Sequence, residues 1–326
     1  MKLFASSLGL AILALTPLTA LAGPTTYTFQ TVQSPGDPAF TQLLGINNSS
    51  TIAGYFGDGS LVPNNGFTLT LPNNFTPENF PGSIQTQVIG IDNGGETVGF
   101  YVDATGVTHG FKNIGGTFST VDFPGSTAVN QLLGVNDNGV AAGFYGDGAG
   151  VFYPYTVTGG GTFTTINFLG EVSAQATDIN NAGLITGFNM TSPTTSDGFL
   201  INGSLITKLD FPGSVFTEAL GLNNSGQVVG FYMDAFGNTH GFVYNTSTQS
   251  FQTVDDPNDP HLTVINGIND QGQIVGFYLD ANGNTDGFVG TPVTSTPTPE
   301  PASVFLLGTG LAGLALRRRS SKSAAR

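Results

Sequence analysis

Three features of the sequence predict an all-β fold, specifically a six-bladed β-propeller of four-stranded repeats. One motif recurs six times at intervals of 43 to 46 residues. Each copy alternates short runs of β-branched and aromatic residues with Asn, Asp and Gly turns, without helical periodicity. The last copy lacks a fourth strand, and a matching strand pattern precedes the first copy. Such a period with strand patterning is typical of propellers. The copies begin at Gly45, Gly90, Gly134, Asp178, Gly221 and Gly267.

The fifth copy shows how each strand is recognised. Its first strand ends at Asn223, and Gly226 follows three residues later, which predicts a tight hairpin turn because both residues suit turn conformations. The second strand is the Val-Gly-Phe-Tyr run that ends near Asp234, where a second turn is expected. The third strand opens on Gly241 and Phe242. The fourth is a Phe-x-Thr-Val run that leads to the next copy.

The missing strand suggests how the array ends. The sixth copy stops after the Gly-Phe of its third strand, whereas a fourth-strand pattern starts at Thr26. If this N-terminal strand completes the last blade, the propeller closes and its terminal edges are covered. We therefore expect a closed propeller, with an open solenoid as the alternative.

Composition supports a folded body of one domain over residues 23–290. The chain has 326 residues, with 47 Gly, no Cys and no Trp. Its 26 Phe and 9 Tyr argue against disorder, because disordered chains are poor in aromatic residues. We therefore interpret the glycines as turn residues between many short strands.

The charge distribution excludes one class of partner. The formal net charge is −14, and Lys112 and Lys208 are the only basic residues of residues 23–290. That region contains every acidic residue except Glu300. A body without arginine lacks the basic surface that nucleic acids and anionic lipids require. We therefore expect no nucleic-acid partner.

The N-terminus has the pattern of a secretory signal peptide over residues 1–22. Lys2 provides the positive start, an apolar stretch follows, and Ala20 and Ala22 form a small-x-small cleavage site. A buried first helix is the alternative. We expect cleavage after Ala22 and export of the body.

The C-terminus combines several sorting features. A linker rich in Pro and Thr spans residues 291–298, and an apolar run of 15 residues spans 302–316. This run predicts a short transmembrane helix, although it is shorter than the roughly 20 residues that cross a bilayer comfortably. Basic residues beyond such a helix stay on the cytoplasmic side. The motif residues are Pro299, Glu300, Pro301, Arg317, Arg318 and Arg319.

This order resembles the PEP-CTERM sorting signal of Gram-negative bacteria over residues 299–326. The resemblance implies recognition by an exosortase-type membrane transpeptidase and removal of the tail. It also implies delivery to the cell surface, outer membrane or exopolysaccharide matrix. Before processing, the C-terminal helix would hold the protein in the membrane. An ordinary single-span anchor is the alternative.

The repeats also resemble the HAF family of extracellular bacterial repeats. The resemblance rests on the triplets His109-Gly110-Phe111 and His240-Gly241-Phe242, and on recurring Gly-Ile-Asn and Val-Gly-Phe-Tyr steps. It supports the fold and the extracellular location. It implies no particular activity.

The body offers little for nucleophilic catalysis. It has no cysteine and no Gly-x-Ser-x-Gly elbow, and two of its three histidines occupy equivalent repeat positions. We expect packing or edge roles for His109 and His240, and an exposed His261. Glycoside chemistry needs two carboxylates at a set separation. Five aspartates follow the second strands and should share one rim, but they recur as turn residues: Asp58, Asp103, Asp147, Asp234 and Asp280.

Two sets of residues are candidates for binding. Oxygen-bearing side chains at alternating positions 280–286 suit Ca²⁺, with a plain hairpin turn as the alternative. The residues at the ends of the first strands could face a central opening and bind a neutral sugar together with exposed tyrosines such as Tyr101 and Tyr278. The calcium set is Asp280, Asn282, Asn284 and Asp286, and the ring is Asn47, Asp92, Asn136, Asn180, Asn223 and Asn269.

These observations favour an exported, non-enzymatic surface or biofilm-matrix protein that associates with exopolysaccharide. No required cofactor is expected beyond the candidate Ca²⁺. Two alternatives remain. One is an extracellular carbohydrate-active enzyme that uses carboxylates of the body, and the other is a purely structural surface shell.

Overall fold

The computed structural model describes residues 25–126, 128–167, 173–192, 194–259 and 261–293. These residues form 24 β-strands and no helix. No helix able to span a membrane occurs within them. The signal-peptide region, the apolar run at 302–316 and the Arg cluster lie outside the described residues.

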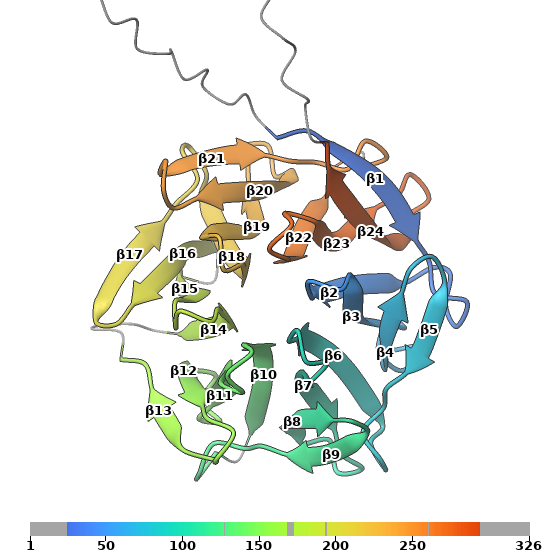
Figure 1. Cartoon of the computed structure of the whole chain (residues 1–326), viewed down its shortest axis with the longest axis vertical. Coiled ribbons are helices and arrows are strands. Elements are labelled where there is room, and N and C mark those ends of the chain that lie inside the picture. The colour runs from blue at the N-terminus through green and yellow to red at the C-terminus, as the bar shows by residue number, and fades with distance from the viewer. Residues whose placement is uncertain (1–24, 127, 168–172, 193, 260, 294–326) are drawn as a thin grey trace, which may run out of the picture.

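The strands form four-stranded units, which we call blades, arranged around a central axis (Figure 1). Within each blade the strands pair antiparallel, from an innermost strand to one at the periphery. No sheet closes on itself. The first three blades are β2 (Thr41–Ile46), β3 (Thr51–Phe56), β4 (Asn65–Thr70) and β5 (Asn74–Pro77); β6 (Gln85–Ile91), β7 (Thr97–Val102), β8 (Thr108–Ile114) and β9 (Thr117–Thr120); and β10 (Val129–Val135), β11 (Ala141–Gly146), β12 (Phe152–Val157) and β13 (Phe163–Thr165).

Single parallel bridges join the second blade to the third and the fourth to the fifth. Each copy of the repeat forms one blade, as the sequence predicts. The last three blades are β14 (Ala174–Ile179), β15 (Ile185–Ser192), β16 (Thr195–Asn202) and β17 (Leu205–Leu209); β18 (Phe216–Leu222), β19 (Gln227–Met233), β20 (Thr239–Asn245) and β21 (Ser250–Thr253); and β22 (Thr263–Ile268), β23 (Ile274–Leu279), β24 (Thr285–Pro292) and β1 (Tyr27–Val32).

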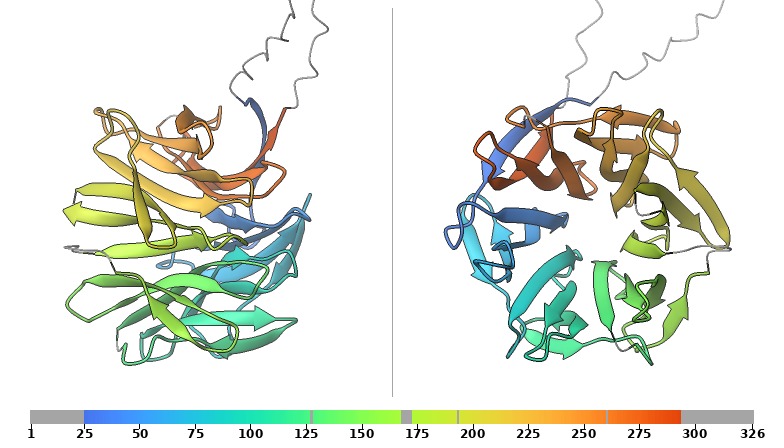
Figure 2. Two further views of the ribbon diagram at one scale, coloured as in Figure 1. Left: turned by 60° about the vertical axis from the view of Figure 1, so that its left-hand side comes forward. Right: turned by 180° about the vertical axis from the view of Figure 1, so that it is seen from behind.

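The N-terminal strand completes the sixth blade, as the sequence predicts. β1 pairs antiparallel with β24 from Tyr27 opposite Pro292 to Val32 opposite Gly287. β24 therefore extends to Pro292, beyond the predicted end of the body at residue 290. The first two residues of the predicted linker belong to this strand because their backbones pair with β1. Both chain ends of the described body lie beside this blade (Figure 2).

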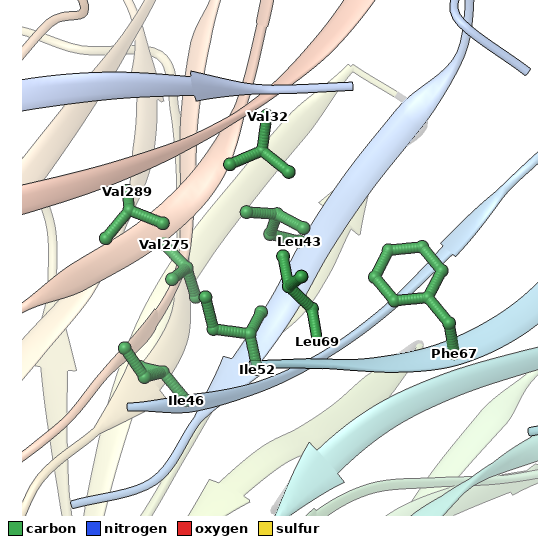
Figure 3. Close-up of a cluster of buried hydrophobic side chains, with 8 residues drawn as sticks. All are labelled: Val32, Leu43, Ile46, Ile52, Phe67, Leu69, Val275 and Val289. Atoms are coloured by element: carbon green, nitrogen blue, oxygen red, sulfur yellow. The ribbon is translucent and has the colours of Figure 1, made fainter. Parts of the chain in front are cut away.

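The hydrophobic core lies between the blades. Each third strand contributes one fully buried ring, at the position that follows Gly in five copies: Phe67, Phe111, Tyr155, Phe199, Phe242 and Phe288. One cluster joins the first and last blades, since Leu43 and Ile52 of the first pack with Val275 and Val289 of the last and with Val32 of β1 (Figure 3). Apolar burial of this kind is the main stabilising contribution to folding.

Every innermost strand has a bulge at the same place. The register shifts by one residue in all six, for example between Leu43 and Gly45 and between Ala176 and Asp178. The glycine that follows the bulge allows close approach of the next blade. A Cβ on Gly45 would lie 2.5 Å from the backbone oxygen of Ile89. The repeated Gly thus follows from packing near the axis.

Candidate functional site in the central channel

The turn after each innermost strand is closed by its Asn or Asp side chain. Oδ1 of Asn136 accepts hydrogen bonds from the backbone N–H of Asn138 (3.0 Å) and Val140 (3.1 Å). Oδ1 of Asn47 accepts from Ser49 and Thr51 in the same way (both 3.0 Å). The predicted hairpin chemistry is therefore present, and the side-chain oxygens are used within their own turns.

The same side chains also link neighbouring blades. In five copies the Asn Nδ2 donates to the backbone carbonyl oxygen of the equivalent residue in the next blade. The pairs are Asn47 to Asp92 (3.0 Å), Asn136 to Asn180 (2.9 Å), Asn180 to Asn223 (3.2 Å), Asn223 to Asn269 (2.9 Å) and Asn269 to Asn47 (3.1 Å). We call these residues, with Asp92, the inner ring. Asp92 has a carboxylate in place of the amide, and burial is the main cause that raises its pKa.

A second circle of hydrogen bonds runs through the next residue of each turn. Its backbone N–H donates to the Oδ1 of the equivalent residue in the following blade, and all six blades take part. We call this set the outer ring: Asn48, Asn93, Asp137, Asn181, Asn224 and Asp270, with N···O distances of 2.8 to 2.9 Å. Sequence reasoning missed it, although an Asn or Asp follows the first one in all six copies.

The residues of the predicted sugar-binding ring lie at the channel, but their side chains bind other parts of the protein. All five Asn side chains are buried. Their amide donors bind the next blade and their oxygens bind their own turn. The donors and acceptors that a ligand would need are therefore already engaged, and the inner ring mainly holds the blades together.

The innermost strands enclose a cavity of about 340 Å³ along the axis. Its wall has layers that follow the β alternation of these strands, since residues i and i+2 share one face. One layer consists of the bulge residues and a deeper layer consists mostly of glutamines. The bulge layer is Leu44, Ile89, Leu133, Thr177, Leu220 and Asn266, and the glutamines are Gln42, Gln87, Gln131 and Gln175.

The fourth blade breaks the repeat inside this cavity. Asp178 stands where the other five copies have Gly, and its carboxylate accepts hydrogen bonds from the backbone N–H of Ile179 and Leu222, each at 2.8 Å. The carboxylate points toward Gly134 of the third blade, where the missing side chain makes room. Burial raises the Asp178 pKa to about 7, against the opposing effect of the two N–H donors. Asp178 therefore joins three adjacent blades.

The aspartates after the second strands lie at the rim opposite the inner ring, and each closes its own turn. Oδ1 of Asp103, for instance, accepts from the backbone N–H of Thr105 (2.8 Å) and Val107 (2.9 Å). Hydrogen bonds from Thr105 and Val107 lower the Asp103 pKa to about 2. The predicted turn role of these residues is present in the structure.

The two repeat histidines lie at this same rim between carboxylates. Nδ1 of His109 lies 2.7 Å from Asp122, and Nδ1 of His240 lies 2.9 Å from Asp255. Burial lowers the pKa of His240, whereas Asp255 and Asp234 raise it. The effect of the two carboxylates is the larger, so the pKa of His240 is raised overall. His261 is exposed, as expected.

The predicted calcium ligands do not converge in this structure. The Nδ2 atoms of Asn282 and Asn284 donate to Asp280 Oδ2, both at 3.1 Å, so their amino groups face the carboxylate. Asp286 instead binds Gln33 Nε2 at 2.8 Å. Within the described ranges, no group of three or more His, Cys, Asp or Glu side chains is arranged to hold a metal ion.

The expectation of exposed tyrosines is wrong for Tyr101 and Tyr278, which are buried. Tyr101 stacks on Phe80 with ring centroids 3.7 Å apart. Tyr232 stacks in the same way on Phe211 at 3.5 Å. The Phe of the Phe-Pro-Gly corner covers these rings, a pairing that the separate strand patterns did not reveal.

The comparisons with known proteins address the fold and the tail. A TolB protein from Agrobacterium tumefaciens has a similar structure, with TM-score 0.58 and 11% identity over 84% of this chain and 100% of that chain. The fold is a β-propeller. AofleA from Arthrobotrys oligospora gives TM-score 0.48 and 10% identity over 85% of this chain and 86% of that chain. At such identities the likeness concerns the fold alone.

The tail matches a family model described as the PEP-CTERM protein-sorting motif, over residues 297–319. The propeller chain thus carries a sorting motif, which implies export and cell-surface sorting in Gram-negative bacteria through an exosortase-type processing system. No curated protein matches this chain.

Proposed function

We propose that this chain is an exported, non-enzymatic surface or matrix protein that binds exopolysaccharide through its central channel. The observation that carries the proposal is the cavity of about 340 Å³, whose deeper layer is lined by four glutamines. Pockets that bind small ligands start at roughly 300 Å³. The cavity therefore has room for one sugar unit or a short chain end.

The chemistry of the wall suits a sugar. Gln131 and Gln175 offer both donors and acceptors, which match hydroxyl groups. Gln42 Oε1 already accepts from the Tyr55 hydroxyl group at 2.9 Å, and Gln87 Nε2 already donates to Asn64 at 2.8 Å. Leu44, Ile89 and Leu133 give three adjacent blades an aliphatic surface against which the C–H face of a sugar ring can pack. In the other three blades, Thr177 and Asn266 add polar groups to this layer on either side of Leu220. An amphipathic wall of this kind can orient a ring that has one polar and one apolar face.

The charge of the wall narrows the ligand class. The cavity lining contains Asp92, Asp137, Asp178 and Asp270 and no basic residue. Anionic polysaccharides would meet like charges there without any Arg or Lys to compensate. The proposal is therefore restricted to neutral or cationic glycans.

The test is a binding titration of the full-length protein with neutral, cationic and anionic polysaccharides. Leu133→Trp should fill the cavity and abolish binding. The matched control is Leu205→Trp, because Leu205 is 64% exposed on a peripheral strand and its replacement should leave binding unchanged. Binding that survives Leu133→Trp would move the site away from the channel. An absence of binding to every glycan would favour the purely structural shell.

One observation keeps an enzymatic function as the second candidate. Asp178 and Glu218 are carboxylic acids of adjacent blades that depart from the repeat, and most glycoside hydrolases use a pair of Asp or Glu residues. If the protein is a carbohydrate-active enzyme, it should release sugar from the producing organism's own matrix, and Glu218→Gln should stop the release. Intact matrix after prolonged incubation with the wild-type protein would remove this candidate.

A further inference from the structure

Glu218 occupies a position at which four other blades place glutamine in the channel. Gln42, Gln87, Gln131 and Gln175 all line the cavity, each two residues before a bulge residue that also lines it. In the fifth blade the bulge residue Leu220 lines the cavity, and β alternation puts Glu218 on the same face. Glu218 therefore lies on the channel side of β18, next to the residues that line the cavity rather than among them.

This carboxyl group has no protein partner in the described part of the chain. No hydrogen bond or ion pair involves its oxygens, and the two lysines of the body are engaged elsewhere. Lys112 binds Glu96 at 2.9 Å, and Lys208 binds Asp197 at 3.0 Å. Burial raises the Glu218 pKa to about 8. A partly desolvated carboxyl group without a partner is costly, and an ammonium group supplied by a ligand would satisfy it.

We propose that the channel selects glycans that carry a free amine, with the ammonium group bound by the Glu218 carboxylate. This inference rests on the proposed function and names its ligand class. The surroundings favour it, because cations are attracted by the cavity wall, whose charged groups are four aspartates. They are Asp178 on β14 and, in the turns at the mouth, Asp92, Asp137 and Asp270.

The amine has suitable neighbours beyond the carboxylate. An ammonium group donates three hydrogen bonds. The glutamine layer provides carbonyl oxygens, and those of Gln131 and Gln175 have no partner within the described ranges. A calcium ion is less suited, since it takes six to eight oxygen ligands and usually several carboxylates. The single carboxylate among amides fits a monovalent ammonium group better.

The experiment titrates the full-length protein with three oligosaccharides of equal length, built from glucosamine, N-acetylglucosamine or glucose. Each is measured calorimetrically at pH 7 against the wild type, Glu218→Gln and Asp210→Asn. Glu218→Gln restores the residue of four other blades and should fold normally. Asp210→Asn is the matched control, because Asp210 is a well-exposed acid outside the cavity lining.

The wild type should bind the glucosamine oligomer at least about tenfold more tightly than the other two, the size expected for one charge-assisted hydrogen bond. Glu218→Gln should remove this preference, and Asp210→Asn should keep it. Because the bound carboxyl group must be ionised, the affinity for the amine should rise as the pH increases from 5 to 7.

The outcomes separate the inference from the proposed function. Equal binding of all three oligomers, with no effect of Glu218→Gln, would overturn the amine selectivity and keep glycan binding. Binding of ethanolamine but of no oligosaccharide, lost in Glu218→Gln, would support the amine site and contradict the glycan function. An affinity for glucosamine that does not change between pH 5 and 7 would also contradict a role for the Glu218 carboxylate.

Discussion

Asn269 Nδ2 donates a hydrogen bond of 3.1 Å to the backbone carbonyl oxygen of Asn47, 222 residues earlier in the chain. This bond joins the last blade to the first with the same geometry that links four other neighbouring pairs. The backbone N–H of Asp270 adds a second link to Asn48 Oδ1 at 2.9 Å. The sixth blade is therefore linked to the first by the same kinds of hydrogen bond that link the other neighbouring blades.

The one gap in the inner ring predicts a stabilising substitution. Asp92 has no amide to donate to Asn136, so Asp92→Asn should supply the missing bond and remove the repulsion from Glu96 and Asp137. We expect a gain of about 0.5–1.5 kcal/mol in the free energy of unfolding at pH 7. The gain should shrink near pH 4, where protonation lets Asp92 donate by itself. Denaturant unfolding at both pH values measures it.

The neighbouring Asp137→Asn is the matched control. Oδ2 of Asp137 accepts from the amides of both Asn93 (2.9 Å) and Asn181 (2.6 Å), and its Oδ1 accepts a backbone N–H. An amide offers only one oxygen, so this change should be neutral or destabilising. Stabilisation of equal size by both variants would show that reduced negative charge, and not the added bond, is the cause.

The channel carboxyl groups predict how stability depends on pH. Burial raises the pKa of Glu218 from 4.5 to about 8 and that of Asp178 from 3.8 to about 7. For each residue, at pH values between its unfolded-state pKa and its folded-state pKa, the folded protein binds more protons than the unfolded protein. The free energy of unfolding therefore falls as the pH rises through that interval. The Tm should therefore decrease between pH 5 and pH 8. Glu218→Gln should flatten part of this decrease in thermal unfolding scans.

The turn aspartates have the opposite effect, since they make the free energy of unfolding rise with pH, but only at acidic pH. Their pKa values are lowered, so their contribution is present above pH 3.8 and lost as the pH falls toward 2, as Asp103 illustrates. If plots of Tm against pH for the wild type and Glu218→Gln run parallel from pH 5 to pH 8, the predicted role of Glu218 in the pH dependence of stability is contradicted.

Close packing near the axis predicts a costly Gly→Ala substitution. A Cβ at Gly45 would lie 2.5 Å from the backbone oxygen of Ile89, which cannot move without shifting the next blade. Gly45→Ala should destabilise the protein by about 1–3 kcal/mol, the usual effect of overpacking. Gly159→Ala is the control, because its Cβ would meet nothing closer than 3.8 Å. Equal denaturation midpoints for the two variants would contradict the prediction.

The sorting motif predicts a shorter mature protein. Exosortase-type processing should yield a form that begins near Gly23 and ends near Pro299-Glu300-Pro301, recovered from the surface, matrix or medium. Replacement of Arg317, Arg318 and Arg319 by glutamine should leave the tail uncleaved and the protein in the cell envelope. Intact mass and cell fractionation measure both. A wild-type protein that keeps its whole tail in the inner membrane would favour the single-span anchor.

Most of the fold could be predicted from the sequence because each repeat carries its own turn and strand signals. Asn223 and Gly226, for example, mark a hairpin through local backbone preferences alone. The pairing of β1 with β24 was also accessible, since the strand missing at one end is present at the other. The extension of β24 to Pro292 was not, because a Pro/Thr-rich segment has no strand pattern and pairs here through backbone contacts.

The site was less accessible because it depends on relations between blades. The side chain of Asn47 suits both a turn and a ligand, and its hydrogen bond to Asp92 becomes visible only when the blades are placed side by side. The burial of Tyr101 by Phe80 has the same origin. Asp178 and Glu218 were detectable in principle, because both replace a residue that most other copies share.

The pairing of Tyr27–Val32 with β24 also affects when the protein can finish folding. The backbone N–H of Val293 donates to the carbonyl oxygen of Thr26 at 2.8 Å, so the first and last described segments are direct neighbours. The sixth blade needs residues from both ends of the body and cannot be assembled from a partial chain. For an exported protein, both ends must therefore be on the same side of the membrane before the last blade forms.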